Sequence, residues 1–376
     1  MRLRKIKRSQ ASGWRVIRRC VIFFTAICLV PVFLVFMVAT DHYVRPERHK
    51  LSFTLHKSFR DDNDLHSNPN NHNFSMVYKR LDQRRRHLRK ACHILGLDKN
   101  GNDSLHRPNS WEYLVDQKHR LVWCNVFKAA STSWMYNFNI LAGYSPYFLR
   151  KSRTPPLTLA RQKYGRPTLE SLQEALEDEK SVSFLIVRHP LERLLSAYRD
   201  KIQYAVSGSY HFKLGRDIIK NYRKKGTAGP KYPTYPEFIK WLVDSVKGGK
   251  PLDMHWTPIV EFCTPCMFNI KIIAHTETLE DDQDFIIKSA GLQDVIKPEW
   301  KNAGKGSTTA HISSHYSQLT RSLILQLYHI FRFDFELFNY SLNGYLEVGQ
   351  PDQDPSTLLA AITMKDTKPN SIPHIY

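Results

Sequence analysis

Apolar residues are distributed unevenly along the 376-residue chain. No charged residue occurs between positions 20 and 40, a stretch of about the length that crosses the hydrocarbon core of a bilayer as a helix. Residues 41–75 mix His, Asn, Asp and Ser with little periodicity, so they lack the apolar surface that a core requires. From Met76 the pattern of MVYKRLDQRRRHLRKACHIL predicts a basic helix, and the folded body is expected to begin there.

Two short apolar runs, each followed by a turn and an amphipathic helix, stand out in the folded body. RLVWCNV leads through FKAASTS to WMYNFNIL, and SVSFLIV leads through RHP to LERLLSAYRDKI. Apolar strands that alternate with helices indicate a parallel sheet covered on both faces. We therefore expect an α/β fold with a central parallel sheet flanked by helices, whose ligands bind at the carboxyl ends of the strands. Both turns fall at such ends.

The apolar run near the N-terminus is interpreted as a membrane anchor. A secreted protein's signal peptide is the alternative, but the run is longer than an ordinary signal core and no small-residue cleavage site follows it. Positive charges gather on its N-terminal side, so the positive-inside rule predicts type II topology. The expected segments are a cytosolic tail 1–19, a transmembrane signal anchor 20–40, a lumenal stem 41–75, a globular domain 76–345 and a C-terminal tail 346–376.

The formal charge of +20 falls to +12 when the eight cationic residues of the cytosolic tail are set aside. That remainder favours a polyanionic partner, which can be nucleic acid, anionic lipid or an acidic polysaccharide. Because a lumenal domain does not meet nucleic acid, the predicted topology argues against that partner. A basic run with interleaved tyrosines either guides an anionic glycan or forms a solvated helix face; it comprises Lys213, Arg216, Lys220, Arg223, Lys224, Lys225 and Lys231.

Sequons and cysteines agree with a lumenal body. Three sequons can accept N-glycans if they face the lumen, at Asn73, Asn102 and Asn339. Four cysteines follow the anchor, an even number that suits disulfides in an oxidising compartment, namely Cys92, Cys124, Cys263 and Cys266. The spacing of the last two also fits a redox motif or half a zinc site, although a second such pair is missing. A structural disulfide arrangement is favoured, with its pairing left open.

The turn after the first apolar run has the composition of an anion-binding turn. We expect a strand that ends at Val126 and a helix that opens at about Trp134, whose free backbone N–H groups and dipole attract negative charge. Lys128 can contact the anion, and further donors are Ser131, Thr132 and Ser133. The alternative is that these hydroxyls only cap the helix. The turn is not a Walker P-loop, because its GxxxxGK[ST] pattern is absent.

The second turn places Arg188 directly after an apolar strand and Ser196 about two helical turns further on. The planar guanidinium of arginine suits a phosphate, which it can bind at two points. Taken singly, Arg188 also suits a surface ion pair and Ser196 an ordinary helix hydroxyl.

Together the two turns resemble the nucleotide-binding signature of Golgi carbohydrate sulfotransferases, in particular the chondroitin and dermatan 4-O-sulfotransferases and the HNK-1 sulfotransferase. The segment CNVFKAASTSW retains five residues of the family's first motif, namely Cys124, Lys128, Ala130, Thr132 and Trp134. The segment RHPLERLLSAYR retains eight residues of the second motif, namely Arg188, Pro190, Arg193, Leu194, Ser196, Ala197, Tyr198 and Arg199. DMHWTPIVEFCTPC, HTETLEDD and YHIFRFDFELFNY also resemble family segments, so the resemblance covers about 111–340. The departures from the pattern are Phe127, Ser131, Ser133 and His189.

The resemblance implies a P-loop-like sulfotransferase fold over 76–345 and transfer of a sulfuryl group from 3'-phosphoadenosine 5'-phosphosulfate (PAPS), without a metal. It implies that the 5'-phosphosulfate is bound by the residues of the first turn, Lys128, Ala129, Ala130, Ser131, Thr132, Ser133 and Trp134. Arg188 and Ser196 are implied for the 3'-phosphate. The implied acceptor is the 4-hydroxyl of N-acetylgalactosamine in chondroitin or dermatan, with an HNK-1-like glycan terminus as the alternative.

Sulfuryl transfer requires an in-line attack, stabilisation of the leaving phosphate and a base for the attacking hydroxyl. Lys128 is the candidate for the leaving-group oxygen, and His255, in Asp-Met-His-Trp, is the candidate base because imidazole can accept a proton near neutral pH. His189 and Glu192 are the alternatives. A non-catalytic glycan-binding membrane protein and a Golgi glycosyltransferase are the rival functions.

Overall fold

The computed structural model describes residues 69–298 and 309–363. The predicted cytosolic tail, anchor and most of the stem lie outside the described residues. In those two ranges, no helix combines the length and the apolar character that crossing a bilayer demands. The boundaries expected at 76 and 345 stay predictions. Helix α2 (Pro69–Ile94) begins before the first boundary. Beyond the second, α15 (Pro355–Ile362) contacts α13 (Arg321–Leu337) through a hydrogen bond between His329 Nε2 and the carbonyl of Ala361 (2.9 Å).

A four-stranded sheet in the order β1-β2-β3-β4 forms the centre of the α/β part. β2 and β3 are parallel, as are β3 and β4, whereas β1 pairs antiparallel with β2 at the edge. The strands are β1 (Tyr113–Asp116), β2 (Leu121–Cys124), β3 (Val182–Val187) and β4 (Ile272–His275). Every residue of β2 and β3 is buried, which explains why both read as continuous apolar runs. The parallel sheet is thus confirmed for three strands, with an antiparallel strand added at one edge.

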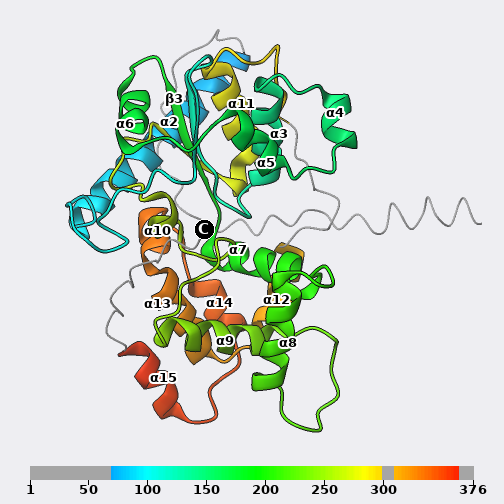
Figure 1. The fold of residues 1–376 in the computed structure, drawn as a ribbon. Coiled ribbons are helices and arrows are strands. Elements are labelled where there is room, and N and C mark those ends of the chain that lie inside the picture. The colour runs from blue at the N-terminus through cyan, green and yellow to red at the C-terminus, as the bar shows by residue number, and fades with distance from the viewer. Residues whose placement is uncertain (1–68, 299–308, 364–376) are drawn as a thin grey trace, which may run out of the picture. The chain divides into compact units, whose positions relative to one another are not determined.

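Helices cover the sheet and belong with it to one hydrophobic core (Figure 1). Trp134 and Phe138 of α3 pack against Trp123 of β2, with ring centroids 6.4 and 5.4 Å apart. The helices of this part are α2 (Pro69–Ile94), α3 (Ser131–Leu141), α4 (Pro146–Lys151), α5 (Pro156–Lys163), α6 (Leu169–Glu177), α10 (Ile259–Cys263), the short 3₁₀-helix η2 (Thr276–Thr278) and α11 (Leu279–Ser289).

The remaining helices enclose a second core on the side of the sheet where the strands end (Figure 1). Leu191, Leu194 and Leu195 of α7 pack in this core with Trp256. Its helices are α7 (Pro190–Ala197), the π-helix η1 (Tyr198–Gln203), α8 (Tyr210–Tyr222), α9 (Tyr235–Lys247), α12 (Ile312–Tyr316), α13 (Arg321–Leu337) and α14 (Asn343–Val348). The 3₁₀-helix η4 (Thr309–His311) contacts α12, and α15 (Pro355–Ile362) contacts α13. Because α7 follows β3 directly, the carboxyl ends of the strands meet this second core.

Two disulfides join segments that are far apart in sequence. Cys92 of α2 is bonded to Cys266, and Cys124 at the end of β2 is bonded to Cys263 of α10. The Cys263–Cys266 pair is therefore not bonded internally, and neither sulfur is a free thiol for redox chemistry or zinc. Closing loops of 139 and 174 residues restricts the unfolded chain, and such a bond typically contributes about 2–4 kcal/mol.

Both predicted strand–helix units are present, with two local differences. β2 ends at Cys124 rather than Val126, and α3 begins at Ser131 rather than about Trp134. The segment after β3 is not one helix: α7 ends at Ala197 and continues as the π-helix η1. A π-helix in mid-sequence changes which side chains face a neighbour, and such insertions are frequent at functional sites.

Candidate functional site

The turn between β2 and α3 has a backbone conformation that non-glycine residues rarely adopt. Lys128 has φ 71° and Ala130 has φ 57°, both in the left-handed region. Each such residue costs about 1 kcal/mol or more and persists where the surroundings impose it, often at a binding site. Left-handed residues that alternate with others in a turn direct neighbouring backbone N–H groups toward a common point, which suits an anion.

The structure does not support the alternative interpretation, in which the hydroxyl residues only cap the helix. The N-cap of α3 is Ala130, without a side-chain capping bond, and Ser131, Thr132 and Ser133 occupy the first helical turn. Among the described residues, the backbone N–H groups of Ser131 and Thr132 have no hydrogen-bond partner, as is usual for the first residues of a helix. The turn therefore presents free donors at the positive end of a helix dipole.

The predicted donor-binding residues of this turn differ in exposure. Thr132 is exposed and Ser131 is partly exposed, but Ser133 is only 1% exposed. Ala129 and Trp134 are fully buried, and the Trp134 ring contacts Phe184 of β3 with centroids 4.4 Å apart. Trp134 thus supports the turn from within the core.

Lys128 lies in an ion-pair cluster with two residues of η1. Its Nζ is 3.1 Å from Asp200 Oδ2, and Lys201 Nζ is 3.3 Å from the same oxygen. Burial lowers the pKa of Lys128, and the charges of Lys201 and Arg188 lower it further, while Asp200 acts in the opposite direction. Burial opposes ionisation of Asp200, but the two ammonium groups outweigh it and lower the pKa of the carboxyl.

Arg188 brings the second predicted turn against the first. Its Nη1 donates to the backbone carbonyl of Lys128 (3.5 Å), and its Nη2 is 3.1 Å from Glu192 Oε2. The side chains of Arg188 and Glu192 are each 15% exposed. Ser196 is partly exposed, and its hydroxyl has no hydrogen-bond partner in the described part of the chain. Lys128 and Arg188 therefore lie close together at the carboxyl ends of β2 and β3, where the sequence places the two turns.

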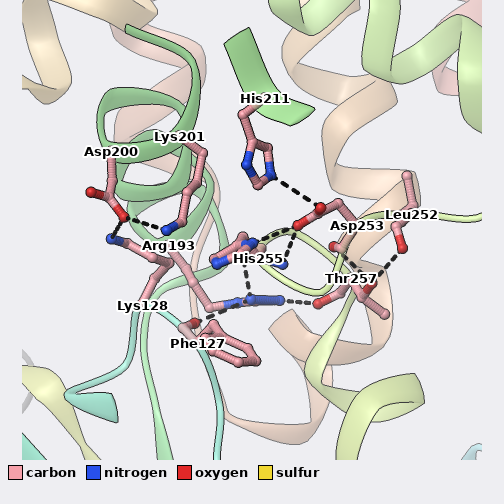
Figure 2. Close-up of polar contacts among 10 residues, drawn as sticks. All are labelled: Phe127, Lys128, Arg193, Asp200, Lys201, His211, Leu252, Asp253, His255 and Thr257. Carbon is pink, nitrogen blue, oxygen red and sulfur yellow. Dashed lines mark hydrogen bonds and ion pairs between the residues drawn. The ribbon is translucent and has the colours of Figure 1, made fainter. Parts of the chain in front are cut away.

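His255 forms a hydrogen-bonded cluster with Asp253 and His211 (Figure 2). His255 Nδ1 lies 2.6 Å from Asp253 Oδ1, and His211 Nε2 lies 3.1 Å from Asp253 Oδ2. Burial opposes ionisation of Asp253, but hydrogen bonds from His211 and His255 outweigh it and lower its pKa. Burial also lowers the pKa of His255, which favours the neutral imidazole. With its Nδ1–H donated to the ionised carboxylate, His255 keeps Nε2 as an acceptor.

The guanidinium of Arg193 connects the Lys128 turn to the His255 segment (Figure 2). It is 1% exposed and donates to the backbone carbonyls of Phe127 (3.4 Å) and His255 (3.2 Å), and also to that of Thr257. Burial lowers its pKa to about 10, and the charge of Asp334 acts in the opposite direction. Arg193 therefore remains charged at neutral pH and fixes the distance between the two parts of the site.

Other residues considered from the sequence have structural partners. His189 caps α7 by accepting from the backbone N–H of Leu191 (3.3 Å), and its Nε2 donates to the carbonyl of Ser341 (3.0 Å), which leaves neither nitrogen for proton transfer. Glu192, the other alternative base, is paired with Arg188. In the basic run, Arg223 is bound to Glu237 through Nε (2.8 Å) and Nη2 (2.9 Å), so it is a structural residue.

The predicted glycosylation positions differ in what the structure says about them. Asn102 and Asn339 are exposed, as an attached glycan requires, and Asn339 has φ 54° directly after α13. Asn73 lies within α2. Glycosylation of all three stays a prediction.

Five residues of the site were not assigned a role from the sequence. Asp200 and Lys201 carry no motif of their own, and their position depends on the π-helix. Asp253 and Arg193 lie within the motifs quoted above, close in sequence to His255 and Arg188. That closeness was the only sequence signal that they belong to the site. His211 offered none, because it lies 42 residues from Asp253.

Comparison with known proteins identifies relatives over most of the folded body. The family model described as "Sulfotransferase family" matches residues 111–341. The chain is 29% identical over 254 residues to carbohydrate sulfotransferase 11 of Rattus norvegicus, which is 64% of this chain and 70% of that protein. It is 29% identical over 247 residues to carbohydrate sulfotransferase 10 of Homo sapiens (62% and 67%) and 28% identical over 275 residues to carbohydrate sulfotransferase 9 of Homo sapiens (69% and 60%). No solved structure matches the chain.

Replacing Arg193 tests whether this residue holds the site together. Arg193→Met leaves three backbone carbonyls without this donor, those of Phe127 and His255 partly buried and that of Thr257 buried, and it leaves Asp334 without its counter-charge. We therefore expect the free energy of unfolding to fall by about 3–5 kcal/mol. Urea denaturation followed by circular dichroism measures the loss. Arg216→Met, at an exposed position of α8, is the control and should change stability by less than about 0.5 kcal/mol. Equal stability of the two variants would contradict the role of Arg193.

Proposed function

The chain belongs to the sulfotransferase family, and on that basis we propose that it transfers a sulfuryl group from PAPS to a sugar hydroxyl of an anionic glycosaminoglycan. The observation that carries the proposal is the contact between Arg188 and the carbonyl of Lys128, because it joins the two turns that the resemblance assigns to opposite phosphates of one nucleotide. A protein that only binds the nucleotide needs no general base, so a residue that can accept the proton of the acceptor hydroxyl distinguishes catalysis from binding alone.

The first turn has a backbone conformation that suits an anionic sulfuryl donor. Free N–H groups of Ser131 and Thr132 and the left-handed Lys128 and Ala130 form the cradle, and Lys128 adds a positive charge. PAPS supplies the sulfuryl group and an adenosine 3'-phosphate as part of the leaving group. Arg188 and the unpartnered hydroxyl of Ser196 are the candidates for that 3'-phosphate.

Lys128 is proposed to stabilise negative charge on the leaving phosphate. Its present partner is Asp200, which also holds Lys201, so a carboxylate occupies the side of the ammonium that an anion would take. A more highly charged donor can exchange with Asp200 while Lys201 retains the carboxylate. Desolvation strengthens each of these contacts, because the side chain of Lys128 is only 18% exposed.

His255 is proposed as the general base. The carboxylate of Asp253 fixes the Nδ1–H tautomer and the ring orientation, which leaves Nε2 to accept the proton of the acceptor hydroxyl. The backbone carbonyl of His255 is bound by Arg193, which also holds the carbonyl of Phe127 beside Lys128. The base and the donor turn are thus joined through one buried cation.

The acceptor is proposed to be chondroitin or dermatan, modified at the 4-hydroxyl of N-acetylgalactosamine. The motif resemblance supports the hydroxyl, and the charge of α8 supports an anionic polymer. Lys213, Arg216 and Lys220 are exposed at helical spacings of three and four, so they lie on one face. His211 at the start of α8 contacts Asp253, and Lys220 lies about 14 Å along the helix from it. At about 3.6 residues per turn, the basic row lies on the face of α8 opposite His211 and extends along the helix away from the proposed base.

The Golgi lumen is the proposed location, with the chain anchored as a type II membrane protein. Two disulfides between distant segments fit an oxidising compartment. The related proteins named above are carbohydrate sulfotransferases.

Arg188 should determine selectivity for the 3'-phosphate. Loss of a charge-assisted contact costs about 1.5–3 kcal/mol, so Arg188→Ala should weaken binding of 3'-phosphoadenosine 5'-phosphate by roughly 10- to 100-fold and leave AMP binding unchanged. Isothermal titration calorimetry on the full-length chain measures both nucleotides, with Arg216→Ala as the control. An Arg188→Ala variant that still prefers the 3'-phosphorylated nucleotide by the wild-type ratio would refute this assignment.

Removal of the proposed base should separate turnover from donor binding. General-base catalysis typically contributes 10²- to 10⁴-fold, so His255→Gln should lower kcat by about that factor, with nucleotide affinity within about twofold of wild type. Transfer of labelled sulfate to desulfated chondroitin measures kcat. His93→Gln, an exposed histidine paired with Asp98, is the matched control. Normal turnover in His255→Gln would exclude it as the base.

The basic row on α8 should act on the polymer and not on the nucleotide. Exposed charges contribute about 0.2–1 kcal/mol each, so the triple change to Gln at Lys213, Arg216 and Lys220 should raise KM for chondroitin roughly tenfold and flatten its dependence on salt. The control triple carries Gln at three other exposed lysines, Lys118, Lys180 and Lys240. If both triples behave alike, α8 does not bind the acceptor.

A further inference from the structure

Three potential metal ligands lie together beside the proposed active site. His211 of α8 and the loop residues Asp253 and His255 each offer one ligand atom, and these atoms all lie within 4.8 Å of one another. Each side chain is only 13–17% exposed. Both imidazoles face the same carboxylate in Figure 2.

We propose that His211, Asp253 and His255 form a zinc-binding site that inhibits the enzyme. The site lies outside the donor-binding turns, and the proposal gives the metal no part in sulfuryl transfer itself. The proposal that zinc binds rests on geometry alone, whereas the proposal that zinc inhibits rests on the proposed role of His255 as the base.

The spacing of the ligand atoms suits a tetrahedral ion after small movements. Zinc binds imidazole nitrogen and carboxylate oxygen at about 2.0–2.2 Å, which places neighbouring ligands of a tetrahedron about 3.3–3.5 Å apart. Here His255 Nδ1 lies 2.6 Å from Asp253 Oδ1 and His211 Nε2 lies 3.1 Å from the other carboxylate oxygen, Oδ2, and one ligand atom of each residue lies within 4.8 Å of the others. Bringing both nitrogens to tetrahedral spacing around a single carboxylate oxygen therefore takes side-chain movements of about 1–1.5 Å.

The donor set selects among metal ions. Two imidazole nitrogens and one carboxylate match zinc and other late transition ions, whereas magnesium and calcium prefer oxygen ligands. Asp253 accepts hydrogen bonds from both histidines and supplies the one carboxylate of the ligand set. Lys201, whose charge acts on His255, opposes the incoming cation and should keep its binding reversible.

Inhibition follows from the tautomer of His255. In the metal-free state the proton of the neutral ring sits on Nδ1, where it is donated to Asp253. A zinc ion bound at Nδ1 displaces that proton to Nε2, with no change in the number of protons on the ring. Nε2 is then a donor and cannot accept the proton of the acceptor hydroxyl. Zinc binding and base catalysis therefore exclude each other.

Cobalt(II) is the probe for the site, since a tetrahedral cobalt centre absorbs visible light much more strongly than the hydrated ion. The full-length chain, stripped with a chelator and free of nucleotide, is titrated with cobalt chloride, and zinc or magnesium chloride is added afterwards. We expect a strong visible band that zinc abolishes and magnesium leaves unchanged. His211→Gln, which keeps a donor toward Asp253, should lose the band, and the control His93→Gln should retain it.

Inhibition is measured as the zinc concentration that halves each variant's own metal-free rate. His211→Gln should need at least tenfold more zinc than wild type or His93→Gln, and a chelator should restore the wild-type rate. Absence of the cobalt band, or an equal band in His211→Gln, overturns the site. A metal bound without loss of turnover overturns the inhibitory part. Normal turnover of His255→Gln would instead reject the proposed base, while the cobalt titration still decides the site.

Discussion

The buried guanidinium of Arg193 is the contact on which the arrangement of the site depends. A charged group in the interior is stable only where hydrogen bonds replace the water that it has lost. Three carbonyls provide them, from the turn after β2 and from the segment that carries His255. Asp334 adds the opposite charge and caps α10 by accepting from the backbone N–H groups of Ile259 and Val260 (2.7 and 2.9 Å). The two hydrophobic cores therefore meet at one cation, which fixes the position of the base relative to the donor turn.

Each predicted donor-binding cation is paired with a carboxylate. Asp200 faces Lys128, and Glu192 faces Arg188. Cations this close repel one another in a poorly solvated site, and the carboxylates offset that repulsion when no anion is present. A nucleotide with several negative charges can take over the same role, so the site is arranged for exchange of one anion for another. Burial lowers the pKa of Lys128, and the carboxylate of Asp200 acts against that lowering.

One of the two disulfides also connects the donor turn to the His255 segment, through a covalent bond. Cys124 lies at the carboxyl end of β2, three residues before Phe127 and the Lys128 turn, and it is bonded to Cys263 in α10. The cross-link therefore joins the strand that leads into the donor turn to the helix that follows the His255 segment. Arg193 connects the same two segments through hydrogen bonds. A covalent and a polar connection thus support the same geometry.

The sequence by itself determined the elements and the chemistry that short segments carry. Continuous apolar runs specified β2 and β3, and the residues after them specified an anion-binding turn and an arginine, because local patterns report burial and capping directly. The antiparallel edge strand, the start of α3 at Ser131 and the π-helix were not predicted, since they depend on packing. Only the tertiary structure placed Asp200 against Lys128 and His211 against Asp253, and only it paired the cysteines across the chain. Those contacts join residues 42 to 174 positions apart, and no local pattern records which distant side chain satisfies a buried charge.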